Sequence, residues 1–158
     1  MNVTETEVSK SFIEVYTKFK LQICRDVFGG RGEEETGLTT VENLCMEVIS
    51  AMERPTINEF ATYIGISQPN AAYKVNSLIR KGYLRKIRSV RDKREYFLEV
   101  TDKFREEKSS GERYLQTVLE RLNDRLSPEE AEELASMLGL ISNELMPEIP
   151  SYRKRRRD

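Results

Sequence analysis

The part of the chain that decides its fold is residues 55–104, which read PTINEFATYIGISQPNAAYKVNSLIRKGYLRKIRSVRDKREYFLEVTDKF. Thr56, followed by a glutamate three residues later, has the pattern of a capping box and predicts the start of a short helix. Gly65 allows a tight turn, and Ser67 is the expected N-cap of a second helix that ends at Lys81-Gly82. The stretch therefore predicts two short helices joined by a tight turn.

A charged β-hairpin is expected to follow these helices. Strands are predicted at Leu84–Ser89 and Glu95–Val100, on either side of the turn Arg91–Arg94. Residues 80–95 contain eight basic side chains and two acidic ones, although the whole chain has a net charge of −1. The basic residues are Arg80, Lys81, Arg85, Lys86, Arg88, Arg91, Lys93 and Arg94. This concentration of positive charge indicates a polyanionic partner, and double-stranded DNA fits best.

Composition limits the class of protein. The 158 residues, 38% hydrophobic and 34% charged, suit one domain or two small lobes with much exposed surface. No apolar run approaches the roughly 20 residues of a membrane-spanning helix. The N-terminal residues MNVTETEVSK lack the basic start and apolar stretch of a signal peptide. We therefore expect a cytoplasmic protein without a membrane partner.

The chain lacks the residues of many catalytic and metal sites. It contains no histidine, which excludes Ser-His and Cys-His dyads and histidine-based zinc sites. The segment Gly29-Gly30-Arg31-Gly32 lacks the spacing of a phosphate-binding loop and reads as a helix stop. We expect no enzymatic activity, no catalytic residue, no cofactor and no metal.

The two cysteines, Cys24 and Cys45, are too few for a disulfide framework, which agrees with a reducing compartment. Both fall on the apolar faces of predicted helices. Because free cysteine is among the most buried residue types, core packing is favoured over redox sensing.

The helix that begins after Ser67 has an outward face suited to the major groove. A helix fits that groove, where Gln and Asn can read adenine and Lys can reach guanine or phosphate. Such a face can also be merely solvated, but the adjacent basic hairpin favours DNA. The face consists of Gln68, Asn70, Tyr73, Lys74 and Ser77.

The hairpin tip has a second feature suited to DNA. An arginine there can enter a narrow minor groove, and the nearby Asp92 can hold its guanidinium by a charge-assisted pair. Charge on an edge strand can instead prevent aggregation. The order of helices and hairpin favours DNA binding. The basic residues of the tip are Arg88, Arg91, Lys93 and Arg94.

Residues 55–104 resemble the MarR family of winged helix-turn-helix regulators. The matching features are Phe60-Ala61 with Ile64, then Ser67, then Leu78 through Lys81-Gly82-Tyr83-Leu84, the Asp92-Lys93-Arg94 wing motif and Thr101. The resemblance implies that Asn70, Tyr73, Lys74 and Ser77 face the major groove and that Arg94 enters the minor groove, oriented by Asp92. It also implies that Thr56 and Ser67 meet phosphates at helix N-termini.

The expected fold class is mainly α (α+β), a winged helix-turn-helix flanked by dimerisation helices. We predict an N-terminal dimerisation helix and connector at 1–36, a DNA-binding lobe at 37–101, C-terminal dimerisation helices at 102–147 and a basic tail at 148–158. One long helix is expected from Thr101 to about Leu126. The apolar stripes enclose little volume alone, which indicates a symmetric dimer. The expected interface residues are Phe12, Tyr16, Phe19, Leu134, Leu138, Ile141 and Leu145.

These features predict a homodimeric transcription regulator, a repressor, that binds a pseudo-palindromic site in double-stranded DNA. The resemblance adds a small-molecule effector that binds between the DNA-binding lobes and the dimerisation helices. The alternative is a winged-helix module whose basic face docks an acidic protein.

Overall fold

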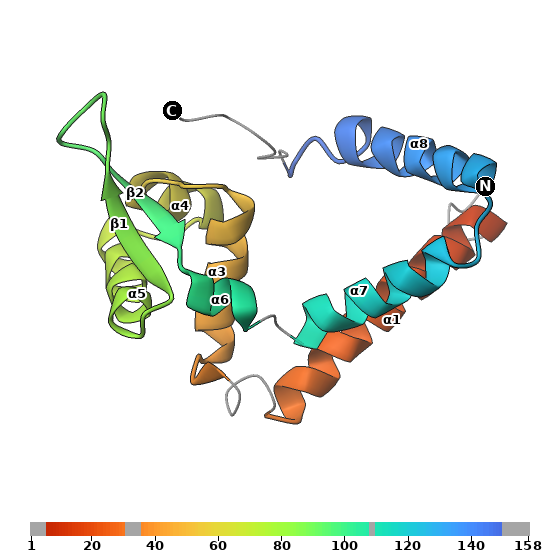
Figure 1. Cartoon of the computed structure of the whole chain (residues 1–158), viewed down its shortest axis with the longest axis horizontal. Helices are drawn as coiled ribbons and strands as arrows, with labels where there is room; N and C mark the ends of the chain where they lie inside the picture. The colour runs from red at the N-terminus through yellow and green to blue at the C-terminus, as the bar shows by residue number, and fades with distance from the viewer. Residues whose placement is uncertain (1–5, 31–35, 108–109, 150–158) are drawn as a thin grey trace. The chain divides into compact units, whose positions relative to one another are not determined.

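The computed structural model describes residues 6–30, 36–107 and 110–149 and divides the chain into two compact units (Figure 1). The first contains the helices α1 (Glu7–Phe28) and α7 (Ser110–Asn123). The second contains α3 (Thr40–Ala51), α4 (Ile57–Ile64), α5 (Gln68–Arg80), β1 (Leu84–Arg88), β2 (Tyr96–Val100), α6 (Asp102–Glu106) and α8 (Pro128–Glu144). The predicted fold class, mainly helical with one β-hairpin, is confirmed.

The helix-turn-helix forms as its capping residues predict. The Thr56 hydroxyl oxygen accepts a hydrogen bond from the Glu59 amide at 3.1 Å, and the Glu59 carboxylate accepts one from the Thr56 amide at 2.9 Å. Gly65 ends α4 with a φ of 72°, a left-handed conformation that glycine adopts without steric cost. The Ser67 hydroxyl then caps α5 by accepting from the Asn70 amide at 3.4 Å. These local bonds fix both helix starts and the turn between them.

The wing is an antiparallel pair of strands. Its register pairs Leu84 with Val100 at the base and Arg88 with Tyr96 near the tip. The base is anchored because the Thr101 amide donates to the Tyr83 carbonyl at 3.0 Å. In addition, the Leu98 amide donates to the Pro55 carbonyl at 2.8 Å. The hairpin is therefore fixed at its base to both sides of the helix-turn-helix.

One apolar core holds α3, α4, α5 and the wing together. The residues that form it are almost fully buried, and their apolar side chains gain the hydrophobic free energy of removal from water. They are Met46, Ile49, Phe60, Ala61, Ala71, Val75, Leu78, Tyr83, Leu84 and Leu98. Cys45 is also buried, as expected for core packing, whereas Cys24 on α1 is exposed in the single chain.

The prediction of one continuous helix from Thr101 to Leu126 is wrong. The segment forms the short α6 and the separate α7, and the residue after α6, Glu107, has the non-helical angles φ −88° and ψ 63°. The Glu107 carboxylate accepts a hydrogen bond from the Tyr83 hydroxyl at 2.5 Å. The Thr101 hydroxyl donates to the Gly82 carbonyl at 2.6 Å. These contacts fix α6 to the base of the wing, so the winged lobe extends beyond the predicted limit at residue 101.

The first unit exposes much apolar surface. Along the 22 residues of α1 the one buried residue is Asp26, and Phe12 and Tyr16 are 52% and 60% exposed. Phe19 differs, because its ring packs edge-on against Tyr114 of α7 with 5.7 Å between the ring centres.

The helix α8 has no buried side chain. Leu134 and Ile141 are half-buried, and Leu138 and Leu145 are 51% and 64% exposed. The basic tail predicted at 148–158 lies almost entirely outside the described residues. Among those described, no helix is long and apolar enough to span a membrane.

The core of the winged lobe predicts the effect of one substitution. Phe60→Ala should lower the free energy of unfolding by about 3–5 kcal/mol, because it removes a fully buried ring and leaves a cavity. Thr62→Ala, an exposed position on the same helix, should change it by less than about 0.5 kcal/mol. Urea denaturation of both variants tests this, and equal stabilities would contradict the assigned core.

Candidate nucleic-acid interface

The first turns of α5 present polar side chains to solvent. Gln68 and Asn70 are exposed, Tyr73 is 72% exposed and Lys74 is half-buried. Because residues three and four apart share a helix face, the Asn70, Tyr73 and Lys74 side chains are neighbours. The opposite face of α5 is fully buried in the core. The structure thus places these residues where a groove-reading face requires them, and their contact with DNA stays a prediction.

Thr56 and Ser67 cap the N-termini of α4 and α5 with their hydroxyl groups. Both hydroxyl oxygens already accept backbone hydrogen bonds, in the capping box of α4 and at the start of α5. Each can still donate its own proton to a phosphate oxygen. Thr56 is half-buried and Ser67 is exposed, so Ser67 is the more accessible of the two.

Ser77 does not lie on the free face on which the sequence placed it. It is half-buried, and its hydroxyl donates a hydrogen bond at 2.8 Å to the Glu42 carboxylate of α3. One further turn along α5, the Lys81 amine pairs with the same carboxylate at 2.7 Å. The C-terminal half of α5 therefore rests against α3. The Ser77 hydroxyl thus helps to position α5, and its contact with a base stays a prediction.

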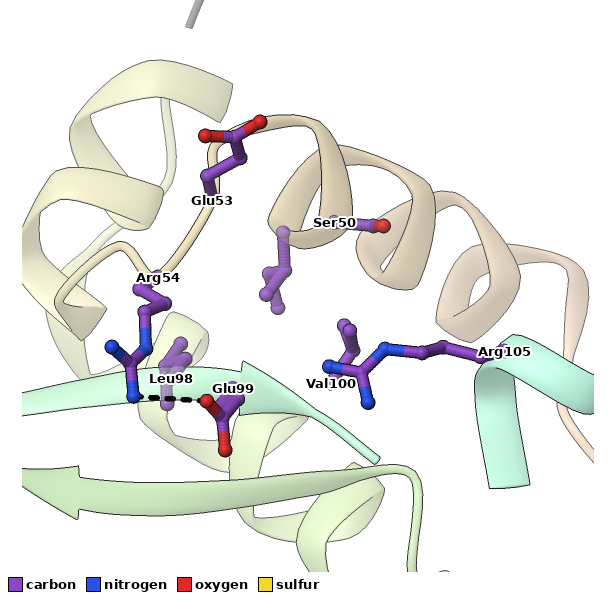
Figure 2. Close-up of a pocket in the computed structure, with 8 residues that line it drawn as sticks. Ser50, Glu53, Arg54, Leu98, Glu99, Val100 and Arg105 are labelled. Carbon is purple, nitrogen blue, oxygen red and sulfur yellow. Dashed lines mark ion pairs between the residues drawn. The ribbon is translucent and has the colours of Figure 1, made fainter. Parts of the chain in front are cut away.

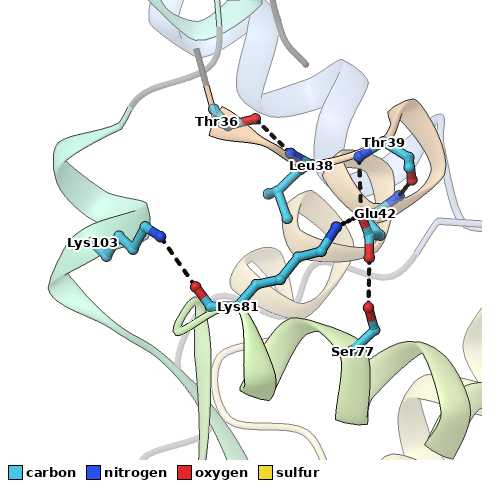
Figure 3. Close-up of polar contacts among 7 residues, drawn as sticks. All are labelled: Thr36, Leu38, Thr39, Glu42, Ser77, Lys81 and Lys103. Atoms are coloured by element: carbon cyan, nitrogen blue, oxygen red, sulfur yellow. Dashed lines mark hydrogen bonds and ion pairs between the residues drawn. The ribbon is translucent and has the colours of Figure 1, made fainter. Parts of the chain in front are cut away.

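The Glu42 carboxylate joins several elements (Figure 3). Besides Ser77 and Lys81, it accepts the Thr39 amide hydrogen bond at 2.9 Å, which completes the capping box of α3. Burial acts to raise the pKa of Glu42, but hydrogen bonds from Lys81, Thr39 and Ser77 and the Lys81 charge outweigh it. The net result lowers the pKa from 4.5 to about 2. The ionised carboxylate is therefore the form that the folded chain stabilises.

The wing tip carries the unpaired positive charge. Every residue from Val90 to Tyr96 is exposed, as is Arg88 at the end of β1. The Arg88 side chain donates from Nε to the Lys93 carbonyl at 2.7 Å, which holds the turn closed. Arg91, Lys93 and Arg94 form no ion pair within the described ranges. These charges are therefore available to a polyanion.

Asp92 acts differently from its predicted role. In the described part of the chain its carboxylate forms no ion pair with the Arg94 side chain. Instead, Oδ1 accepts a hydrogen bond from the Arg94 backbone amide at 2.9 Å. The Asp92 amide donates to the Ser89 hydroxyl at 3.2 Å. Asp92 thus shapes the turn through its backbone, as aspartate commonly does in tight turns.

Part of the local positive charge is compensated inside the lobe. Lys81 pairs with Glu42, and Arg85 pairs with Glu99, its register partner on β2. Glu99 also pairs with Arg54 at 2.9 Å. Burial acts to raise the pKa of Glu99, but these two arginines outweigh it and lower that pKa. The remaining cations of residues 80–95 lie on the exposed face of α5 and on the wing.

Sequence reasoning missed three charged residues that position this surface, Glu42, Arg54 and Glu99. The start of a helix near Thr39 is predictable from the sequence, and Thr39 and Glu42 have the spacing of a capping box. The contact of Glu42 with α5 spans 35 residues and had no sequence signal. The described residues contain no group of three or more acidic or cysteine side chains placed to hold a metal ion.

A helix-turn-helix with an exposed polar face and a basic hairpin defines the winged-helix class of protein. Residues 36–95 match the sequence model of the MarR family. No curated protein matches the chain. The family match covers α3, α4, α5 and β1 of the winged lobe.

Solved structures of similar proteins have the same fold. FabT from Streptococcus pneumoniae in complex with DNA is 21% identical, with a TM-score of 0.55 over 85% of this chain and 92% of that one. Sco3205 from Streptomyces coelicolor, a MarR family transcriptional regulator in complex with DNA, is 22% identical, with a TM-score of 0.53 over 95% and 93%. The transcriptional regulator Tm0710 from Thermotoga maritima is 19% identical, with a TM-score of 0.57 over 85% and 90%.

The low pKa of Glu42 predicts a dependence of stability on pH. Because this pKa is lower in the folded chain than the ordinary value of 4.5, the stabilisation is complete above pH 4.5 and is lost as the pH falls toward 2. The loss should be about 3 kcal/mol in the free energy of unfolding. Glu42→Gln should abolish this part of the acid destabilisation.

Urea denaturation at about pH 7 and about pH 2.5 measures this effect. The control is Glu106→Gln, which removes an exposed carboxylate from α6 of the same lobe. It should retain the difference seen in the wild type. A Glu42→Gln variant with the same pH dependence as the wild type would show that the contacts of Glu42 do not stabilise the fold.

Proposed function

We propose that this protein is a homodimeric transcription regulator, a repressor, that binds a pseudo-palindromic site in double-stranded DNA. The observation that carries the proposal is the combination of α5 and the wing. An exposed polar helix face and an unpaired cationic loop project from the same small core, as major-groove and minor-groove contacts require. The match of residues 36–95 to the MarR family and the two solved DNA complexes of similar fold support it.

In this proposal different residues contact the major groove, the minor groove and the phosphates. Gln68, Asn70, Tyr73 and Lys74 face base edges in the major groove. The wing contributes Arg88, Arg91, Lys93 and Arg94, with Arg94 in the minor groove and Asp92 fixing the backbone on which Arg94 sits. Thr56 and Ser67 donate to phosphates at the helix starts. Phosphate contacts supply affinity and base contacts supply the sequence preference.

The exposed apolar surface supports the proposed dimer. Phe12 and Tyr16 on α1, Leu138 on α8 and Leu145 just after α8 are each more than half exposed in the single chain. Water contact with so much apolar surface is unfavourable, and a symmetric second copy would cover the same residues on both chains. Two copies of α5 would then read half-sites about 10 base pairs apart, which is one turn of duplex.

Arg94 provides the sharpest test of the DNA-binding proposal. With a duplex selected from random sequence by the purified protein, Arg94→Ala should weaken binding by about tenfold or more, since it removes a minor-groove charge. Arg121→Ala, an exposed arginine on α7, is the matched control and should change the affinity little. Arg157→Ala, in the tail outside the described residues, should also have little effect. Fluorescence anisotropy measures all four proteins.

Salt dependence separates this function from the alternative of docking an acidic protein. Wild-type affinity for the selected duplex should fall steeply with salt, and the slope should be reduced by about one for Arg94→Ala. Binding without sequence preference, or equal affinity of the wild type and Arg94→Ala, would contradict the proposal.

The proposed interface predicts the oligomeric state. Leu138→Asp should convert a dimer into a monomer at micromolar concentration, because it places a charge on the apolar surface of α8. Val90→Asp adds the same charge to the wing, where the residue is 88% exposed, and should leave the dimer intact. Sedimentation equilibrium distinguishes the two states. A monomeric wild type would overturn the dimer.

A further inference from the structure

The side chain of Glu99 connects the wing to a distant part of the winged lobe. Its Oε1 lies 2.9 Å from Arg54 Nη2, in the turn after α3 (Figure 2). Its Oε2 accepts a hydrogen bond from Arg85 Nε of β1 at 2.6 Å. The Glu99 side chain is 16% exposed, against 43% for Arg54 and 61% for Arg85. The shared carboxylate is therefore the best shielded of the three groups, and shielding from water strengthens its ion pairs.

The turn that carries Arg54 has an unusual backbone. Glu53 and Arg54 have φ angles of 49° and 66°, values that non-glycine residues rarely adopt. Consecutive residues in this conformation persist only where the surrounding structure holds them. The next residue, Pro55, is fully buried, and its carbonyl accepts the Leu98 amide hydrogen bond at 2.8 Å. The strained turn thus places both its own backbone and the Arg54 side chain beside β2.

The position of the wing tip depends on contacts at the wing base, because a two-stranded hairpin is only marginally stable by itself. Leu84 and Leu98 are buried in the core, whereas every residue from Val90 to Tyr96 is exposed. Arg94 at the tip is separated from Glu99 by roughly 16 Å of extended chain. A rotation of the base by about 10° would move the tip by about 3 Å, which is about half the width of a minor groove.

We propose that Glu99 is a positioning residue for DNA binding and that it holds the wing at the angle from which the tip reaches the minor groove. This inference rests on the proposed function. Glu99 acts through Arg54 and through the backbone of β2, and not by contact with DNA. Without its charge, the wing is held by its backbone hydrogen bonds and by Leu84 and Leu98. The tip then has more positions to lose on binding, and that ordering weakens the complex.

The expected sign distinguishes this role from a simple charge effect. Glu99→Gln removes a negative charge from a lobe that binds a polyanion and leaves two guanidinium groups without their carboxylate. Through charge alone, this substitution would strengthen DNA binding. A positioning role predicts the opposite result, which is weaker binding of the duplex selected by the wild type.

Fluorescence anisotropy at about 0.15 M salt, where the Debye length is about 8 Å, measures this effect. Glu99→Gln should weaken binding of the selected duplex by about fivefold. The matched control is Glu95→Gln, which neutralises an exposed acid of the same hairpin that forms no ion pair among the described residues. This control should bind as tightly as the wild type or more tightly. Unchanged or tighter binding by Glu99→Gln would overturn the proposal.

A double-mutant cycle with Arg94 shows whether Glu99 acts through the wing tip. If it does, Glu99→Gln should weaken binding by less than about twofold in a protein that already carries Arg94→Ala. A general loss of stability would instead weaken binding by the same factor in both backgrounds. Equal fold-changes in the two backgrounds would therefore overturn the action of Glu99 through the tip.

Amide hydrogen exchange tests the attachment of the wing without DNA. The Leu98 amide is bonded to the Pro55 carbonyl at the wing base, and the Val75 amide in the buried part of α5 reports unfolding of the whole lobe. In Glu99→Gln, the ratio of the Leu98 rate to the Val75 rate should rise by at least about threefold. An unchanged ratio overturns the proposal. A raised ratio, in a protein whose wild type has no affinity for duplex DNA, supports the attachment and overturns the proposed function alone.

Discussion

Burial of one face of α5 is the constraint on which the rest of the lobe depends. Ala71, Val75 and Leu78 are fully buried against α3, α4 and the wing, and this fixes the rotation of the helix about its axis. Because a helix has only one face toward the core, the opposite face is left to solvent. That face holds Asn70 and Tyr73. The position of this exposed polar face is thus a direct result of hydrophobic packing.

The carboxylates of Glu42 and Glu99 add polar contacts to this hydrophobic packing. Glu42 binds Ser77 and Lys81 and so holds the C-terminal half of α5 against α3. Glu99 pairs with Arg85 of β1 and with Arg54 in the turn after α3, and so connects the wing to that turn. Both are largely removed from water, where an ion pair is worth more than at an exposed site. The basic residues of the lobe therefore fall into two groups, paired and unpaired. The cations paired with these two carboxylates hold the lobe together, whereas Arg91, Lys93 and Arg94 at the wing tip form no ion pair in the described part of the chain.

Most of the fold could be predicted from the sequence, because its signals are local. Capping residues at Thr56 and Ser67, the left-handed Gly65 and the alternating strands around the wing each act over a few residues. The long helix after Thr101 was the exception. No apolar side chain occurs from Arg105 to Arg113, and α6 ends where the Tyr83 hydroxyl binds Glu107 across 24 residues. No periodicity in the sequence reports such a contact.

The sequence alone determined the order of the elements, the exposed polar face of α5 and the basic composition of the wing, because helix caps, hydrophobic spacing and charge are properties of neighbouring residues. Tertiary structure decided that Ser77 faces Glu42, that Asp92 binds a backbone amide and not a guanidinium, and that Arg54 and Arg85 share Glu99. Each of these depends on which side chains the folded backbone brings within about 3 Å of one another, and that distance is set by packing across the whole lobe.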